Sequence, residues 1–246
     1  MQRQDHPSGH SPFISVITPT LNVSATIRHS IESVLSQTFT DFEYLVMDGG
    51  SEDGTEQTVK AYDKVTWVSE PDRGIYDAMN KGIAIAKGTW VYFLGADDRL
   101  YDDEVFSDVF KYAGENNTDI IYGDAHFLVK DFIHGGAYDP VRITQSNICH
   151  QAMFVKRSLF ERLGNFDLKY PINADWEFNL RAFGRNDVHT AYLPRTIVHY
   201  NNRGESGTHL DQAFLADRRN LIMKHYSLSR LTAYLRFIAK QRIGIG

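Results

Sequence analysis

Two adjacent carboxylates, Asp97 and Asp98, follow the apolar run Trp90–Leu94 after a short Gly95-Ala96 step. Like charges held this close raise each other's pKa unless a cation lies near them. A hard divalent cation with oxygen ligands resolves that conflict, so the pair is a candidate metal site. A plain surface turn is the alternative, and the local pattern leaves both interpretations open.

The segment Asp48–Thr55 is rich in turn-forming residues and directly follows a second apolar run, Tyr44–Met47. An aspartate at a strand end can accept hydrogen bonds from a base imide or from ribose hydroxyls, and glycines let a backbone approach a ligand closely. The segment matches neither the phosphate loop nor the dinucleotide-binding glycine pattern. Kinase-type phosphate binding and NAD binding therefore lose support, while an ordinary turn remains the alternative.

A third segment, 70–82, carries two basic side chains, Arg73 and Lys81, within an acidic part of the chain. A capped helix start accounts for Pro71 and Asp72, but it does not account for these two cations. Guanidinium and ammonium groups bind phosphate oxygens strongly, so both are candidates for contacts with a diphosphate.

These segments need a scaffold that brings them together, and the first hundred residues predict one. Strand-type runs alternate with apolar residues at helical spacing. We expect strands at 14–19, 44–47, 65–68 and 90–94, and helices at 27–35, 55–62 and 75–86. Regular alternation predicts an α/β fold with a mostly parallel central sheet flanked by helices. Ligands of such sheets bind beyond the carboxyl ends of the strands. That edge here carries Thr20, Asn22, Asp48, Glu70, Asp72, Asp97 and Asp98.

The second half is less regular, but no proline- or glycine-rich linker separates it from the first. We expect further strands at 120–122, 152–155 and 196–198, and helices at 158–163 and 176–183. The two halves are therefore predicted to be fused in a single unit.

Taken in order, several segments resemble the nucleotide-sugar half of family-2 glycosyltransferases, which have the GT-A fold. They are Thr18–Asn22, Asp48–Thr55, Asp72–Gly82 and Ala96-Asp97-Asp98, continuing in Cys149–Phe154 and Ala174–Arg181. Each motif is weak alone, whereas their order and spacing are specific. The resemblance covers roughly Pro12 to Gly207, and Asp72–Gly82 looks most like bacterial enzymes that build cell-surface polysaccharides.

The resemblance implies roles for individual residues. The nucleotide-binding set would be Thr20, Asn22, Asp48, Asp72, Arg73, Lys81 and Asp97. Within it, Asp48 would hold the base with Thr20 beside it. Asp97 would bind a divalent cation, Mn²⁺ or Mg²⁺, that bridges the diphosphate, and Asp98 would support the metal or the sugar.

Asp175 would be the general base of the reaction. It stands with Trp176 at the start of a predicted helix, where the indole would partly shield the carboxylate at the sugar or acceptor site. A plain helix N-cap is the alternative for Asp175. His150 and Gln151 would line the same sugar or acceptor site, although a packed core histidine is an equally simple explanation. Arg203 would contact phosphate.

Two departures from the family pattern affect these assignments. The metal motif often reads Asp-x-Asp, and its first position is here Gly95, which leaves fewer protein ligands for the cation. The general base often follows a glutamate, whereas Ala174 precedes Asp175 in this chain.

Charge is distributed unevenly along the chain. The net charge is −5, yet seven basic residues and no acidic one lie between Arg218 and the C-terminus. The acidic body should repel nucleic acid. The segment 208–246 predicts a basic amphipathic helical tail that could lie on an anionic membrane surface, and a helix packed on the body with a solvated basic face is the alternative.

The remaining features concern the cellular context. A single cysteine, Cys149, excludes an intrachain disulfide, which fits a cytoplasmic protein with or without a peripheral place on the inner membrane face. No apolar run is long enough for a transmembrane helix. Residues 1–11 are polar and are expected to form a disordered tail rather than a signal peptide.

We therefore expect a nucleotide-sugar-binding half at 12–100, an acceptor and catalytic half at 101–207 and the basic tail at 208–246. The expected function is inverting transfer of a hexose or N-acetylhexosamine from a nucleotide-diphosphate sugar, most simply a UDP-sugar, to a glycan or lipid-linked saccharide hydroxyl. One alternative is a sugar nucleotidyltransferase, although its glycine-rich basic signature is absent near 18–22. The other is an inactive nucleotide-sugar-binding protein of the same fold, which Gly95 and Ala174 would favour.

Overall fold

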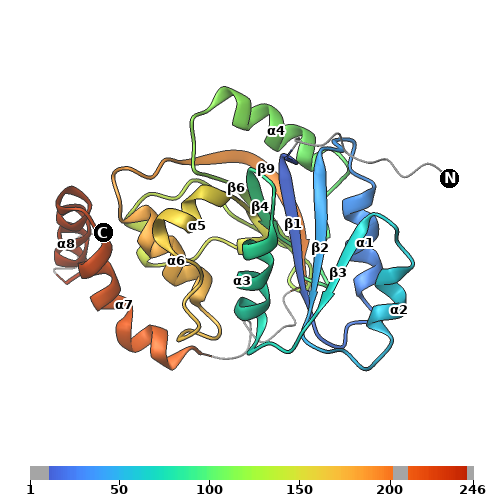
Figure 1. The fold of residues 1–246 in the computed structure, drawn as a ribbon. Coiled ribbons are helices and arrows are strands. Elements are labelled where there is room, and N and C mark those ends of the chain that lie inside the picture. Colours follow the sequence, from blue (N-terminus) through green and yellow to red (C-terminus); the bar gives the residue numbers. More distant parts are fainter. Residues whose placement is uncertain (1–10, 202–209, 243–246) are drawn as a thin grey trace.

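The structure is a computed structural model that describes residues 11–201 and 210–242. These residues form a nine-stranded sheet with helices packed on it (Figure 1). The strand order is β3-β2-β1-β4-β8-β6-β9-β5, and β7 pairs with β6. Helices cover the sheet: α3 packs on β1 and β2 and is drawn to the left of β1 in Figure 1, and α1 and α2 lie at the right of the view. The predicted tail 1–11 falls on residues outside the described part, apart from its last residue.

The first half alternates strands and helices, which confirms the predicted pattern. Its elements are β1 (Ile14–Thr20), α1 (Ile27–Leu35), β2 (Phe42–Asp48), α2 (Thr55–Lys60), β3 (Val65–Ser69), α3 (Ile75–Ile85) and β4 (Trp90–Phe93). β1 pairs in parallel with β2 and β4, and β2 pairs in parallel with β3. β1 is buried along its whole length, as expected for a strand covered on both faces. The carboxyl ends of these strands therefore meet at one edge.

The second half joins the same sheet but is mixed in direction. Its elements are β5 (Arg99–Leu100), α4 (Val105–Glu115), β6 (Ile120–Phe127), β7 (Phe132–His134), the short 3-10 turns η1 (Arg142–Thr144) and η2 (His150–Ala152), β8 (Met153–Lys156), α5 (Arg157–Leu163), α6 (Ala174–Phe183) and β9 (Thr190–Tyr200). β8 runs antiparallel to both β4 and β6, and β6 pairs in parallel with β9. The halves are thus fused through the β4–β8 pair.

Several elements of the second half differ from the sequence prediction. β6 and β9 are longer than predicted, and α4, β5 and β7 were not predicted at all. Pro194 lies inside β9, and proline ordinarily marks the end or edge of a strand. The β6–β9 register shifts between Tyr122 and Ala125, so the chain accommodates the proline at an irregular point of the ladder.

Two apolar cores lie on the two faces of the sheet. One core packs α1, α2 and α4 against the sheet through residues such as Ile31 and Phe106. The other packs α3, α5 and α6 through residues such as Met79, Phe160 and Phe178. Both cores contain residues from each half of the chain, so neither half buries its apolar surface alone.

Gly82 allows α3 to approach β1 closely, because an added Cβ would lie 2.6 Å from Ile17 Cγ2. We expect Gly82→Ala to lower the free energy of unfolding by about 1–3 kcal/mol through overpacking. This destabilisation outweighs the stabilisation of roughly 1 kcal/mol that alanine brings through its higher helix propensity. Gly114→Ala in α4 is the matched control, since a Cβ there meets nothing within 4 Å. Urea unfolding compares the two, and equal stability would contradict the close helix–strand contact.

The C-terminal tail forms two helices, α7 (Gln212–His225) and α8 (Leu228–Arg242). α7 buries Phe214 and Ile222 in the core beside α6. In α8, Tyr234 packs on the same core together with Leu231, whereas Leu235 is about half exposed, at 49%. The apolar face predicted for the tail is therefore divided between the body and the surface. None of the described helices is long and apolar enough to cross a membrane.

Candidate active site

A cavity of about 500 Å³ lies where the two halves of the sheet meet, beyond the carboxyl ends of β1 and β4. The first half contributes Pro19, the start of α3 (73–77) and the segment 95–98. The second half contributes the η2 turn and the end of β9. The predicted site residues that line this cavity are Arg73, Asp97, Asp98, His150 and Gln151.

Asp98 is buried in the wall of this cavity, with 2% of its surface exposed. Its carboxylate accepts hydrogen bonds from Asn201 N at 2.7 Å and from Gln151 Nε2 at 3.0 Å. Burial raises the pKa of Asp98 to about 7, and the charge of Asp97 acts in the same direction. A Cβ at position 95 would overlap the Asp98 carboxylate, so Gly95 provides the room that this inward side chain needs.

Asp97 points its carboxylate toward the end of β9, where Asn201 Nδ2 donates a hydrogen bond to it at 2.9 Å. Partial burial raises the pKa of Asp97. A nearby cation would stabilise the ionised form of this partly buried carboxylate. A divalent ion that takes most of its oxygens from a diphosphate and water needs one or two protein carboxylates. Asp97 fits that requirement, because its side chain is exposed at the cavity, whereas Asp98 is buried and accepts hydrogen bonds from both Gln151 and Asn201.

The described residues contain no group of three or more histidine, cysteine, aspartate or glutamate side chains that could hold a metal. A cation at Asp97 would therefore depend on oxygens from the substrate. This agrees with Gly95, which removes one carboxylate from the usual motif.

Asp175 lies in the first turn of α6 and is 8% exposed. Its Oδ1 lies 2.9 Å from Tyr76 Oη and accepts from Trp176 N at 2.7 Å. Its Oδ2 accepts from Asn147 Nδ2 at 3.0 Å and lies 3.1 Å from His150 Nδ1. The N-cap position of α6 is Asn173, so the plain capping role does not describe Asp175. The carboxylate joins α3, α6 and the η2 turn beside the cavity.

The turn after β2 is organised by Asp48, which is 3% exposed. Asp48 accepts hydrogen bonds from Ser51 N at 2.9 Å and Ser69 Oγ at 2.7 Å. Burial opposes ionisation, but these hydrogen bonds outweigh it and lower the pKa of Asp48. Thr20 Oγ1 lies 3.4 Å from Asp48 Oδ1, and Asn22 N donates to Ser51 Oγ at 2.8 Å. Thr20, Asn22 and Asp48 thus build one turn and lie outside the residues that line the cavity.

The segment before α3 connects that turn to the cavity. An added Cβ on Gly49 would lie 2.5 Å from Asp72 Oδ2, so the Asp72 carboxylate rests directly against the turn. Arg73 lines the cavity and pairs with Asp77 at 3.3 Å. Lys81 donates to the Pro71 carbonyl at 2.6 Å and is absent from the cavity wall. Of the two predicted phosphate-binding cations, Arg73 is thus the one that the structure places at the cavity.

Trp176 turns toward the tail. Its Nε1 donates to the Ile143 carbonyl at 2.7 Å, and its ring lies 5.1 Å from that of Phe214 in α7. The indole therefore helps to anchor α7 and does not line the cavity that contains Asp97. Arg203 lies outside the described residues.

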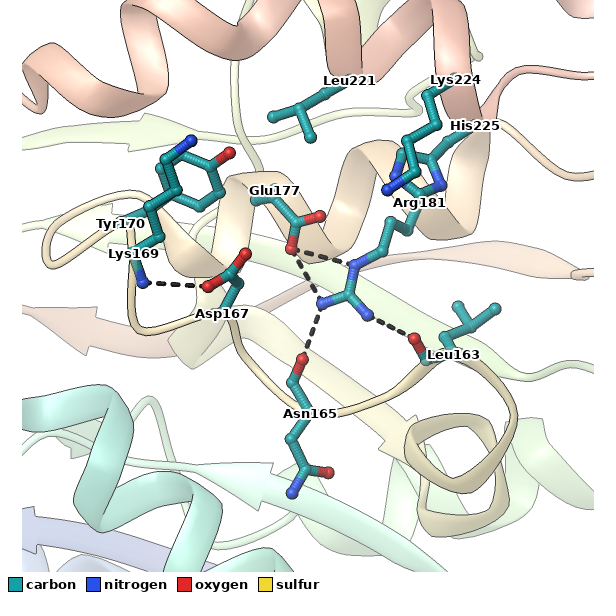
Figure 2. A pocket seen from close by; sticks show the side chains of 10 residues that line it. All are labelled: Leu163, Asn165, Asp167, Lys169, Tyr170, Glu177, Arg181, Leu221, Lys224 and His225. Carbon is teal, nitrogen blue, oxygen red and sulfur yellow. Dashed lines mark hydrogen bonds and ion pairs between the residues drawn. The ribbon is translucent and has the colours of Figure 1, made fainter.

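A second cavity of about 440 Å³ lies between α6, α7 and the loop 163–170 (Figure 2). Arg181 pairs there with Glu177 at 2.8 Å and donates to the carbonyls of Leu163 and Asn165 at 2.6 and 2.8 Å. These bonds fasten the loop to the helix that carries Asp175. None of the predicted site residues lines this cavity.

Three residues of the site were not identified from the sequence. Tyr76 and Asn147 bond Asp175 from 99 and 28 residues away, and Asn201 bonds Asp97 from 104 residues away. No local motif marks such partners, because each gains its role only when distant segments meet.

The sheet, its helices and the acidic cavity at the strand ends define a GT-A-like glycosyltransferase fold. S. aureus TarS 1–349 superimposes with a TM-score of 0.71 at 19% identity, covering 87% of this chain and 65% of that one. The mannosyltransferase PcManGT from Pyrobaculum calidifontis gives a TM-score of 0.63 at 19% identity, covering 93% and 65%. This chain spans 36% of a longer TarS chain.

Sequence similarity identifies the family. Residues 15–163 match the model of glycosyl transferase family 2. A Mycobacterium bovis protein named PGL/p-HBAD biosynthesis glycosyltransferase is 39% identical over 213 residues, which is 83% of each chain. The chain therefore belongs to glycosyl transferase family 2 and is a glycosyltransferase, as the sequence motifs predicted.

Proposed function

We propose that this enzyme moves a sugar from a nucleotide-diphosphate sugar, most simply a UDP-sugar, to a hydroxyl of a glycan or lipid-linked saccharide, with inversion at the anomeric carbon. One observation carries the proposal. A single cavity is lined by the acidic pair Asp97-Asp98 of the first half and by His150 of the second, and the His150 ring is bonded to Asp175. Residues 12–100 would hold the donor, and 101–207 would hold the acceptor.

Proteins of similar fold support this choice of donor. TarS has been solved with UDP and with UDP-GlcNAc, and PcManGT with GDP-Man and Mn²⁺. A hexose or an N-acetylhexosamine is therefore the expected sugar. Its nucleoside would lie along the turn built by Thr20, Asn22 and Asp48 with Asp72 beside it, and Arg73 would lie toward the phosphates with Lys81 behind it.

The site residues match the demands of this reaction. The departing nucleoside diphosphate carries several negative charges, and a Mn²⁺ or Mg²⁺ ion held at Asp97 would act as a Lewis acid on it. Arg73 adds positive charge to the same wall. The acceptor hydroxyl needs a base, and we place that base at Asp175. A single in-line displacement assisted by one base inverts the anomeric configuration through an oxocarbenium-like transition state.

Donor binding and transfer can be tested in one series. Thermal unfolding is measured with UDP-glucose, UDP-GlcNAc and GDP-mannose, each with and without Mn²⁺, because a bound donor raises the melting temperature by mass action. Transfer to glycan and lipid-linked saccharide acceptors is then followed by mass spectrometry. Release of pyrophosphate would instead indicate a nucleotidyltransferase. Absence of stabilisation by every donor would contradict the proposal.

We further propose that this cytoplasmic enzyme docks on the inner membrane face through α8, which would bring it to a lipid-linked acceptor. Exposed Leu235, Arg236 and Lys240 support this contact, since anionic lipid attracts each nearby basic group by about 1 kcal/mol. We expect Leu235→Ser combined with Arg236→Gln and Lys240→Gln to abolish flotation with phosphatidylglycerol vesicles. Lys111→Gln in α4 is the control, and unchanged flotation of the triple variant would contradict the docking.

A further inference from the structure

The side chains that surround the Asp175 carboxylate differ in whether they can always donate a hydrogen bond to it. Tyr76 has one hydroxyl proton, and its Oη lies 2.9 Å from both Asp175 Oδ1 and the Ile172 carbonyl oxygen, so it serves one of them at a time. His150 Nδ1 donates to Oδ2 only when that nitrogen carries the proton. Asn147 Nδ2 always carries protons and donates to Oδ2 at 3.0 Å. Its hydrogen bond therefore depends on no shared or mobile proton.

A second amide fixes the direction of the Asn147 side chain. An ionised carboxylate only accepts hydrogen bonds, so the Asn147 group that faces Asp175 is the NH₂ group. The Asn147 oxygen in turn accepts from Asn179 Nδ2 at 2.8 Å. Asn179 lies four residues after Asp175 in α6 and is 1% exposed. Turning the Asn147 amide over would set oxygen against oxygen at Asp175 and NH₂ against NH₂ at Asn179, so the chain of bonds has a single direction.

The segment that carries Asn147 is anchored through its main chain as well. The Asn147 carbonyl accepts from Tyr138 Oη at 2.9 Å, and the Ile143 carbonyl accepts from Trp176 Nε1 at 2.7 Å. Asn147 is not among the residues that line the main cavity. Its side chain is thus held against the carboxylate and is not placed to touch a substrate in that cavity.

We propose that Asn147 is a positioning residue for the general base: its amide, oriented by Asn179, fixes the rotamer of Asp175 and favours the ionised carboxylate. This inference rests on the proposed function, in which Asp175 takes the proton of the acceptor hydroxyl. A hydrogen bond donated to a carboxylate favours its charged form, and only that form can accept a proton. Rates also fall steeply when a reacting group leaves its productive orientation.

The first test compares two substitutions at this position. Asn147→Ala removes the amide, whereas Asn147→Asp keeps the shape and the bond from Asn179 but places a carboxylate where the donor was. Transfer is measured with whichever of UDP-glucose, UDP-GlcNAc and GDP-mannose stabilises the enzyme most. We expect kcat to fall by about 10- to 100-fold in both variants. KM for the nucleotide sugar should stay near the wild-type value. Asn117→Ala, which changes an exposed asparagine, is the control.

The pH profile of kcat separates positioning of the base from a general loss of structure. Its acidic limb should move to higher pH in both variants, because the ionised carboxylate loses a donor. The move should be larger in Asn147→Asp, where a second negative charge opposes ionisation of Asp175. The other titratable groups near Asp175, namely Tyr76, His150 and Cys149, are the same in both variants. An acidic limb that stays in place in Asn147→Asp would overturn the inference, whatever the rate.

The second test needs neither substrate nor activity. In proton–nitrogen NMR spectra, the side-chain amide of Asn147, assigned by the signal lost in Asn147→Asp, should move upfield in Asp175→Asn, because its acceptor loses its charge. An Asn147 signal that did not respond would overturn the inference. A wild-type enzyme that transfers no sugar from any donor would refute the proposed function instead, and the amide signal would still show whether Asn147 holds Asp175.

Discussion

Replacing Asp175 with asparagine is expected to lower the rate of sugar transfer by about 100- to 10,000-fold, the contribution of a positioned acid–base group. The amide removes the negative charge next to His150. An amide is not basic and cannot take the proton of the acceptor hydroxyl, while its oxygen can still accept the hydrogen bond from Asn147 Nδ2. Donor binding should change little, because Asp175 does not line the cavity.

The measurement is initial-rate transfer together with calorimetric titration of the nucleotide. Asp63→Asn, an exposed aspartate in the α2–β3 connection, is the matched control. Loss of nucleotide binding along with activity would show that Asp175 maintains the fold of the site instead of supporting proton transfer. Full activity of the variant would remove Asp175 from the mechanism.

Asp97→Ala has the second largest expected effect, and it acts on metal-dependent donor binding. Removing even an outer-shell partner of a metal costs about 10- to 100-fold in affinity, so we expect UDP affinity in the presence of Mn²⁺ to fall at least about 10-fold. Affinity in the presence of a chelator should hardly change. Isothermal titration with and without Mn²⁺ separates the two contributions.

Asp103→Ala, which changes an exposed aspartate five residues after Asp98, is the control for Asp97→Ala. A variant that kept its full response to manganese would show that the cation binds elsewhere. The buried neighbour Asp98 offers no equivalent test, because its hydrogen bonds to Gln151 and Asn201 hold the cavity wall together.

The sequence predicted the first half of the fold closely, because each of its strands and helices shows a clear pattern of apolar residues. Local signals also marked Asp97 and Asp98 as candidate site residues, whereas Asp175 was marked only by the family resemblance. The second half was predicted less completely. β5 has two residues, and β9 contains Pro194, so tertiary pairing and not local preference makes them strands.

The hydrogen-bond partners of Asp175 could not be predicted from local sequence patterns. Tyr76 is an ordinary helix residue in the sequence, and its meaning comes only from the packing of α3 beside the loop before α6. The same holds for Asn201, whose two bonds to the acidic pair depend on β9 lying next to β5. Trp176 shows that neighbours in sequence need not share a site, because its side chain contacts Ile143 and Phe214 and does not line the cavity.

The β4–β8 pair has a consequence for how enzymes with this architecture diversify. Recombination near residue 100 would separate Trp90 from Lys156 and Tyr92 from Phe154, and it would divide both apolar cores. New donor or acceptor preferences therefore cannot arise by exchanging one half for a foreign module. They must accumulate through single substitutions along the cavity wall that both halves form. Because the halves share both cores, heating should unfold the whole body in one cooperative step.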